Sequence, residues 1–395
     1  ENLNKYHKTK FSLKYWRIFI GPWLSNFLHS TFDKWENIRI IKKKYIINST
    51  SVIKIKNIDI VPNTLEEYNK LMSTDIWNHY IYSKVIKHHY ENSIVYEDIE
   101  IDYKWKKNPL AGSFNTNLSE IKGIKKSKFL ILVYKIINKI YYYLKKNDDV
   151  FIYKTYLGKN LEKNIRVNFN QISSHFLYLE EKKNLVEKLN RKILRLDFEC
   201  KNQFENFIKD IIIDLIPLIY IENFKYFKSS LLDLPFPKNP KLILSSHILN
   251  NSQTSLYTAE KLENGCKLVY GQHGGVYGQY KFAWKEKHEL EVCDKYLTWG
   301  WKKKNDKKII PFGTIKDLDN YKFNSQNLNY SNNLLLICRA RSRYEHKLNS
   351  SNGINQFDKY IQDNLNFGSY LDSKIRKDLI VRLHTRKYGW LEDER

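Results

Sequence analysis

The sequence predicts an α/β protein in which Rossmann-like parallel sheets follow a helical N-terminal region. Three observations lead to this prediction. Apolar and aromatic side chains recur at helical spacing over residues 13–48. From residue 241 onward, short apolar runs alternate with helical stretches, and the same alternation begins again after residue 332. Alternating strands and helices are typical of parallel sheets, so two such sheets are expected.

The first 240 residues read as mainly helical. Gly21-Pro22 interrupts the first apolar pattern, and a proline at that point predicts a helix boundary or a kink. Residues 64–90, 120–146 and 181–230 are expected to be mainly helical. Residues 150–156 form a short apolar run, which predicts a strand.

Residues 241–270 predict a βαβ unit. Residues 241–245 and 266–270 are short apolar runs, and the stretch 252–263 between them has helical spacing. Asn264-Gly265 predicts the end of that helix, because glycine adopts a positive φ easily. A third strand is expected over residues 295–298. Since ligands of open parallel sheets bind at the carboxyl ends of the strands, a site is expected after these strands.

A polar, asparagine-rich passage between residues 311 and 332 is interpreted as an interdomain linker. It divides the chain into an N-terminal α/β domain, residues 1–325, and a C-terminal Rossmann-like domain, residues 326–395. Strands are expected over residues 333–338 and 378–383, with a helix over 355–371 between them. Two strands leave both sheet edges uncovered, so the second domain is expected to be incomplete and the chain to be a fragment at both ends.

The chain is strongly basic, with 67 basic and 43 acidic residues and a net charge of +24. Such a balance favours nucleic acid or an anionic membrane surface as a partner. Lysine, however, is abundant throughout, together with Asn, Ile, Tyr and Phe, so it is a poor indicator of a specific patch. Seven of the 12 arginines lie after residue 338, and guanidinium groups bind phosphate or carboxylate bidentately. An anionic ligand near the C-terminal segment is therefore favoured over diffuse polyanion binding.

The cysteines are far apart and form no CxxC pair, so neither a zinc site nor a disulfide framework is indicated. They are Cys200, Cys266, Cys293 and Cys338. The longest apolar stretches, near residues 129–144 and 211–221, contain Lys or Asp and are too short to cross a bilayer. We therefore expect a cytoplasmic protein without a transmembrane helix and without a signal peptide.

A glycine-rich loop follows the second strand of the βαβ unit. Four of the 14 glycines lie within residues 271–278, around His273. Glycines after a strand let backbone amides approach an anion or a sugar closely. A neutral imidazole is the commonest side-chain base near pH 7, which makes His273 a candidate general base. A tight turn with an incidental histidine explains the same pattern, and the loop alone leaves both interpretations open.

Several residues near this loop are candidates for the same site. Glu286 and Glu289 are favoured among the following acidic residues, because a carboxylate can orient His273 as a base. Most of that charge is also explained by a solvated helix face. The loop residues expected to contact substrate are Gln272, Gly274, Gly275 and Tyr277. The HExxH spacing of zinc proteases is absent, so no metal site is expected.

Two groups of arginines follow the predicted C-terminal strands. Arg339, Arg341 and Arg343 come after residues 333–338, and they share one side of the strand if it continues. Arg382 and Arg386 flank the end of the last strand. The carboxyl ends of such strands are where a diphosphate binds in a doubly wound sheet. Solvated surface charge is the competing interpretation.

Several short motifs together resemble a known family. In chain order they are Lys14-Tyr15-Trp16-Arg17, Gly21-Pro22-Trp23-Leu24, Asp75-Ile76-Trp77-Asn78, the loop 271–278, Trp299-Gly300-Trp301, and Arg382-Leu383 with Tyr388-Gly389-Trp390. From the first helix to the last residues, this set resembles transferases of bacterial O-antigen and surface-polysaccharide clusters. The resemblance implies a GT-B-like enzyme that moves a sugar from a nucleotide-activated donor to a growing surface glycan.

The resemblance also sets the expected partners. A nucleotide-sugar donor is the substrate, no separate cofactor is needed, and the acceptor is a glycan or a lipid-linked glycan. Peripheral association with the anionic inner membrane surface is compatible with this activity. The loop with His273 is also similar to that of CDP-polyol phosphotransferases, which remain an alternative. A nucleic-acid-binding protein, for which no recognition motif is found, and an inactive scaffold are further alternatives.

Overall fold

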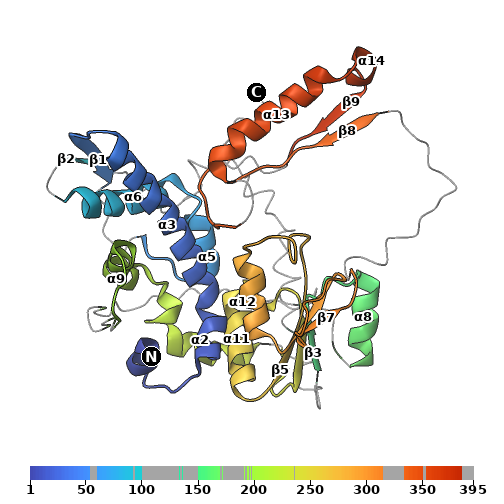
Figure 1. Cartoon of the computed structure of the whole chain (residues 1–395). Coiled ribbons are helices and arrows are strands. Elements are labelled where there is room, and N and C mark those ends of the chain that lie inside the picture. Colours follow the sequence, from blue (N-terminus) through green and yellow to red (C-terminus); the bar gives the residue numbers. More distant parts are fainter. Residues whose placement is uncertain are drawn as a thin grey trace.

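The computed structural model describes residues 1–53, 60–91, 94–99, 150–169, 198–234, 236–314, 333–349 and 353–384, with single positions at 133, 136, 171, 191, 194 and 196. Within these residues the chain is a mixed α/β protein (Figure 1). A helical N-terminal part packs against a five-stranded sheet, and a smaller strand-helix-strand unit follows the sheet in sequence. The predicted α/β class is therefore confirmed.

The larger sheet has five parallel strands in the order β3-β4-β5-β6-β7. Their bounds are β3 Val150–Tyr153, β4 Leu242–Ser245, β5 Lys267–Gly271, β6 Lys295–Thr298 and β7 Ile309–Pro311. The register is continuous across the sheet, with Leu242 opposite Lys267 and Tyr270 opposite Tyr296. Because all strands run in the same direction, the loops that follow β3, β4 and β5 emerge at one edge.

The predicted βαβ unit is present as β4, helix α11 (Ser252–Glu263) and β5. Asn251 begins α11, since its side-chain oxygen accepts a hydrogen bond from the backbone N–H of Gln253 at 3.0 Å. Gly265, with a φ of +91°, ends the helix. The backbone N–H of Gly265 donates to the carbonyl of Leu262 at 3.1 Å. The sequence therefore predicted both ends of this helix correctly.

The N-terminal part is built of helices. They are α1 (Asn2–His7), α2 (Leu13–Phe19), α3 (Gly21–Lys44), α5 (Leu65–Leu71), α6 (Asp75–Tyr90), α9 (Gln203–Leu215) and α10 (Phe224–Ser229), with 3-10 turns η4 (Leu218–Tyr220) and η5 (Ser230–Asp233). Pro22 lies in the first turn of α3, where its missing N–H leaves no helical hydrogen bond unmade. The helix boundary predicted at Gly21-Pro22 is confirmed.

Aromatic side chains form much of the core of the helical part. Trp23 stacks on Phe27 with ring centroids 5.2 Å apart, and it meets Tyr68 edge-on at 6.2 Å. All three side chains are fully buried, which contributes about 1.5–3 kcal/mol each. Helix α2 joins this part to the sheet, because the hydroxyl of Tyr15 donates to Glu260 on α11 at 2.6 Å. Figure 1 shows α11 and α12 (Trp284–Val292) between the sheet and α2.

A second, small parallel pair was not predicted. Strands β1 (Ser49–Ile53) and β2 (Val95–Ile99) pair in parallel and lie beside α6. Their sequences, STSVI and VYEDI, mix polar and apolar residues over only five positions each. Such short mixed runs carry no clear period, and the sequence gives no strand signal there.

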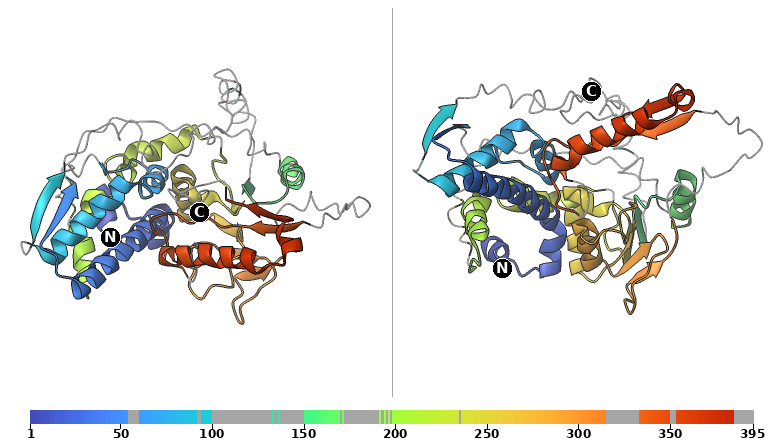
Figure 2. Two further views of the ribbon diagram at one scale, coloured as in Figure 1. Left: turned by 90° about the horizontal axis from the view of Figure 1, so that it is seen from above. Right: turned by 45° about the horizontal axis from the view of Figure 1, so that its top comes forward.

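The C-terminal unit is a second parallel pair with a crossover helix. It consists of β8 (Leu334–Ile337), η9 (Ile354–Gln356), α13 (Phe357–Tyr370), α14 (Ser373–Arg376) and β9 (Leu379–Arg382). These elements confirm the strands and the helix expected after residue 332. Figure 2 shows α13 and the strand pair lying over the five-stranded sheet when the molecule is viewed from above. Residues 339–349, which follow β8, contact both the helical part and α12.

One predicted strand is longer than the strand in the structure. β3 ends at Tyr153, whereas a strand over 150–156 was expected. Lys154 and Tyr156 have φ angles of +47° and +66°, which no strand accommodates. A helix, α8 (Lys159–Asn168), follows this turn.

Several expectations fall outside the described residues. These are most of the helix expected over 120–146, the part of 181–230 before residue 198, and the linker with the domain boundary between residues 325 and 326. In the described part of the chain, no helix is both long and apolar enough to span a bilayer. All four cysteines are free thiols, and Cys266 and Cys293 are buried.

Candidate functional site

His273 is held in a hydrogen-bonded chain at the carboxyl end of β5. Its Nε2 lies 3.0 Å from the hydroxyl of Tyr277. That hydroxyl donates to Glu289 Oε1 at 3.2 Å, and the hydroxyl of Tyr296 donates to Glu289 Oε2 at 3.1 Å. The tautomer of His273 with its proton on Nε2 satisfies this chain and leaves a lone pair on Nδ1.

Burial keeps both acidic and basic members of this chain neutral. Glu289 is 3% exposed, and burial raises the pKa of its carboxyl to about 8. The His273 side chain is 10% exposed, and its Nδ1 lies 3.7 Å from Glu289 Oε1. Burial, followed by the charges of Lys285, His247 and Lys347, lowers the pKa of His273 to about 3. At neutral pH the imidazole is therefore uncharged, and its Nδ1 is buried beside Glu289.

A second histidine stands beside His273. The ring centroid of His247, which follows β4, lies 4.6 Å from that of His273. His247 Nε2 is 2.6 Å from the hydroxyl of Tyr156, which follows β3. Burial lowers the pKa of His247 to about 4, with Lys285 and Lys154 adding to the effect. Three neighbouring strands thus place Tyr156, His247 and His273 together at one edge of the sheet.

The two predicted carboxylates have different positions. Glu289 lies within reach of His273, as expected of an orienting carboxylate. Glu286 Oε2 instead accepts a hydrogen bond from the backbone N–H of Gly278 at 2.9 Å. Glu286 therefore fastens the far end of the glycine loop to α12.

The buried side chain of Gln272 forms hydrogen bonds within the protein. Its Oε1 accepts hydrogen bonds from the backbone N–H of Trp299 at 2.9 Å and from Trp301 Nε1 at 2.8 Å. Its Nε2 donates to the carbonyl of Gly274 at 2.7 Å. These bonds tie the loop to the Trp299-Gly300-Trp301 segment. The expected substrate contacts of Gln272, Gly274, Gly275 and Tyr277 remain predictions.

Gly278 is the glycine of the loop 271–278 at which a side chain would cause the most strain. Its φ is +75°, and a Cβ there would lie 2.9 Å from the ring of Trp301. We expect Gly278→Ala to destabilise the protein by about 1–3 kcal/mol, through backbone strain plus displacement of the indole. Gly300→Ala is the matched control, since Gly300 has a φ of +109° but no atom within 4 Å of the added Cβ. Urea unfolding of both variants measures the difference, and equal losses would exclude the steric part.

The three arginines lie beyond the end of β8, so the alternation expected for a continuing strand does not apply to them. β8 ends at Ile337, so the chain has left the strand before Arg341 and Arg343. The backbone N–H of Arg339, whose side chain is exposed, donates to the hydroxyl of Tyr360 at 2.7 Å.

The other arginines form ion pairs or lie on the surface. Arg341 pairs with Glu345 at 2.9 Å, and Arg343 pairs with Asp75 on α6 at 3.4 Å. Arg382 is exposed at the end of β9, and position 386 lies outside the described residues. Their predicted phosphate contacts remain predictions.

Comparison with known proteins gives the family. The family model described as LIC12162 family transferase matches residues 1–395. The chain belongs to this family. It is therefore a transferase, and an enzyme. No curated protein and no solved structure matches the chain.

The sequence analysis of this transferase did not identify four residues near His273, namely Tyr156, His247, Lys285 and Lys347. For the first two a signal existed, because Tyr156 ends one predicted strand, His247 follows another, and adjacent parallel strands bring their carboxyl ends together. Lys285 and Lys347 carried no such signal, since nothing in the chain links α12 to the segment after β8.

Glu289 should leave a pH signature in the stability of this transferase. Its folded pKa, about 8, lies above the usual value of 4.5, so the folded state holds a proton that the unfolded state has lost between these pH values. Stability from this group is complete below pH 4.5 and is lost as the pH rises towards 8, by up to about 1.4 kcal/mol per pH unit. We expect Glu289→Gln to remove this slope. Urea titrations of both proteins from pH 5 to 8 test it, and parallel curves would contradict the raised pKa.

No group of three or more His, Cys, Asp or Glu side chains in the described ranges could hold a metal ion.

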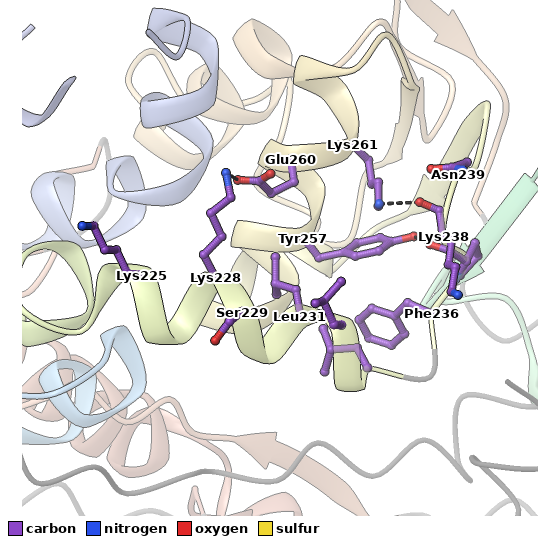
Figure 3. Close-up of a pocket in the computed structure, with 13 residues that line it drawn as sticks. Lys225, Lys228, Ser229, Leu231, Phe236, Lys238, Asn239, Tyr257, Glu260 and Lys261 are labelled. Carbon is purple, nitrogen blue, oxygen red and sulfur yellow. Dashed lines mark hydrogen bonds and ion pairs between the residues drawn. The ribbon is translucent and has the colours of Figure 1, made fainter. Parts of the chain in front are cut away.

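A separate cavity of about 550 Å³ is lined by residues of α10, η5 and α11 and by residues 236–239 (Figure 3). None of its lining residues belongs to the chain around His273. Its residues 236–239 lead into the amino end of β4, which is opposite to the carboxyl edge where His273 is found.

Proposed function

We propose that this transferase is a glycosyltransferase that moves a sugar from a nucleotide-activated donor to a surface-polysaccharide acceptor of the O-antigen type. One observation carries the proposal: a neutral histidine, His273, is fixed by Tyr277 and Glu289 where the parallel strands end. A positioned side chain that accepts the proton of the attacking hydroxyl accelerates such a transfer. The family match supports transfer chemistry, and the motif resemblance described above supports a sugar as the transferred group.

In this reaction the acceptor hydroxyl attacks the anomeric carbon of the donor sugar. The bond between that carbon and the phosphate oxygen breaks, the nucleoside diphosphate leaves, and His273 takes the hydroxyl proton. Tyr277 and Glu289 hold the imidazole in place, and they are positioning residues in this scheme. The imidazolium formed by this transfer would lie 3.7 Å from Glu289, and its positive charge would favour ionisation of that carboxyl.

A GT-B-like arrangement accounts for the two sheets. The five-stranded sheet would bind the acceptor, and the unit around β8 and β9 would contribute to the donor side. Residues 339–349 join this unit to the helical part, where the hydroxyl of Tyr344 bonds to Asp75, and to α12, where the backbone N–H of Trp284 donates to Asn349 at 3.4 Å. The reaction would take place in the cytoplasm, with peripheral contact to the inner membrane.

Transfer of a phosphorylated polyol from a CDP-activated donor is the second candidate, favoured by the similarity of the loop 271–278. Product analysis separates the two reactions. Glycosyl transfer from a sugar diphosphonucleotide releases the nucleoside diphosphate and leaves no donor phosphorus in the product. Polyol-phosphate transfer releases CMP and places one phosphate in the product.

The experiment incubates the full chain with a panel of nucleotide sugars and CDP-polyols and with a surface-polysaccharide acceptor. Nucleotide release is followed by chromatography, and the product is analysed for sugar and phosphorus. We expect nucleoside diphosphate release that depends on the acceptor. CMP release with phosphorus in the product would replace the proposal by its alternative, and no transfer from any donor would refute it.

A further inference from the structure

Two lysines lie where the segment 339–349 rests on α12, and the proposed reaction gives them no role. Lys285 lies in the first turn of α12, and Lys347 belongs to the segment. Lys347 Nζ lies 5.8 Å from the ring centroid of Trp284, whose backbone N–H donates to Asn349 at 3.4 Å. Both lysines are partly buried at the same end of this helix.

Within the ranges that the structure describes, the two ammonium groups lack an ion-pair partner. Among the described residues, no acidic side chain forms an ion pair with Lys285 or Lys347. Lys285 Nζ donates to Asn250 Oδ1 at 3.1 Å, and the acid that acts on it electrostatically, Glu289, is itself protonated near neutral pH. Burial, with the charge of Lys285, lowers the pKa of Lys347 to about 8. Two like charges that share a partly buried site without a counter-ion destabilise the ligand-free protein.

Further nitrogen atoms surround the two lysines. The positive charge of Lys347 contributes to lowering the pKa of His29, on α3, and that of His273. The Nδ1 atoms of both rings are buried and have no hydrogen-bond partner within the described part of the chain. Asn250 links Lys285 to His247, because its side chain contacts both. The helical part, the sheet part and the segment after β8 thus each bring a nitrogen group to one place.

We propose that Lys285 and Lys347 together bind the phosphate group of an anionic ligand at the junction of the sheet and the segment 339–349. A phosphate or diphosphate supplies the missing negative charge and accepts hydrogen bonds from both ammonium groups. Two of the arginines expected to do this, Arg341 and Arg343, pair with carboxylates instead. That the phosphate belongs to the sugar donor rests on the proposed function, but the anion site does not.

Titration calorimetry of the full chain with inorganic pyrophosphate tests the site. We expect the wild type to bind, and Lys285→Met and Lys347→Met each to weaken binding by about tenfold or more, the effect of losing a charge-assisted hydrogen bond. Lys287→Met is the matched control, since this substitution removes the same charge from an exposed position on the same helix. Lys347→Arg keeps the charge and should bind within a few-fold of the wild type.

The same variants answer two further points. Without ligand, Lys347→Met should melt at a higher temperature than the wild type, because an uncompensated charge is removed; a lower melting temperature or failure to fold would contradict the inference. No pyrophosphate binding by the wild type at about 10 mM, or equal binding by all variants, would also overturn it.

The source of the phosphate is found by comparing ligands. Titrations with UDP, GDP and CDP are run beside pyrophosphate. Tighter binding of one nucleotide identifies the donor as the source, whereas equal affinities indicate recognition of the phosphate alone; both support the site. Sugar transfer that fails while pyrophosphate binds at these lysines would count against the proposed function only.

Discussion

Replacing His273 by glutamine is expected to lower kcat for sugar transfer by about 10²- to 10⁴-fold, which is the usual contribution of a general base. Glutamine keeps a hydrogen-bonding group beside Tyr277, so the loop and its glycines should stay in place. It has no lone pair basic enough to accept the hydroxyl proton. Donor binding, measured by calorimetry, should be unchanged. Initial rates at saturating donor and acceptor, compared with the wild type, measure the loss.

Two variants accompany this measurement. Tyr277→Phe removes the hydroxyl 3.0 Å from His273 Nε2 and should lower kcat less, with a changed pH profile, because the base is still present but no longer oriented. His79→Gln, on α6 and away from the sheet edge, is the control for loss of a histidine. If His273→Gln turns over as fast as His79→Gln, then His273 is not the base.

The low pKa of His273 makes it a weak base in the ligand-free protein. Burial is the largest cause, and the charges of Lys285 and Lys347 are two of the others. A phosphate bound at these lysines would offset both charges, and the pKa of His273 would rise towards the range in which a base works best. Donor binding would then prepare the base for the acceptor, which predicts that the donor binds first.

Local signals explain what the sequence could predict. The unit β4-α11-β5 was found because its apolar runs, the helical spacing between them and Gly265 all lie within 30 consecutive residues. His273 was found for the same reason, as a histidine inside a glycine cluster just after a strand. Glu289 was favoured because it follows closely in the chain and can reach the same edge.

Contacts between distant segments explain the rest. Trp284 and Asn349 are 65 residues apart in the chain, and no periodicity indicates that they touch. Lysine is so abundant in this sequence that Lys285 and Lys347 look like any others. The arginines differ from the lysines in being rare enough to attract attention, but the carboxylate partners of Arg341 and Arg343 become visible only in the fold.

Acid should unfold this transferase steeply below pH 6.5. Burial is the main cause that lowers the pKa of several described histidines, among them His247 and His288 to about 4 and His273 and His346 to about 3. Between these values and 6.5, the unfolded state binds protons that the folded state excludes. The free energy of unfolding therefore falls as the pH is lowered, by up to about 1.4 kcal/mol per pH unit for each histidine. Protonation of Glu289 opposes only part of this loss.

Urea unfolding at pH 7, 6 and 5 measures the effect, and we expect a loss of several kcal/mol, a large part of the stability of an ordinary domain. His346→Gln should reduce the slope, since it removes one of the excluded protons. Ser342→Ala is its matched control: it removes the hydroxyl 2.6 Å from His346 Nε2 but keeps the imidazole, so the slope should stay close to that of the wild type. A wild type as stable at pH 5 as at pH 7 would show that these histidines are protonated in the folded state, and would remove the reason for treating His273 as a neutral base.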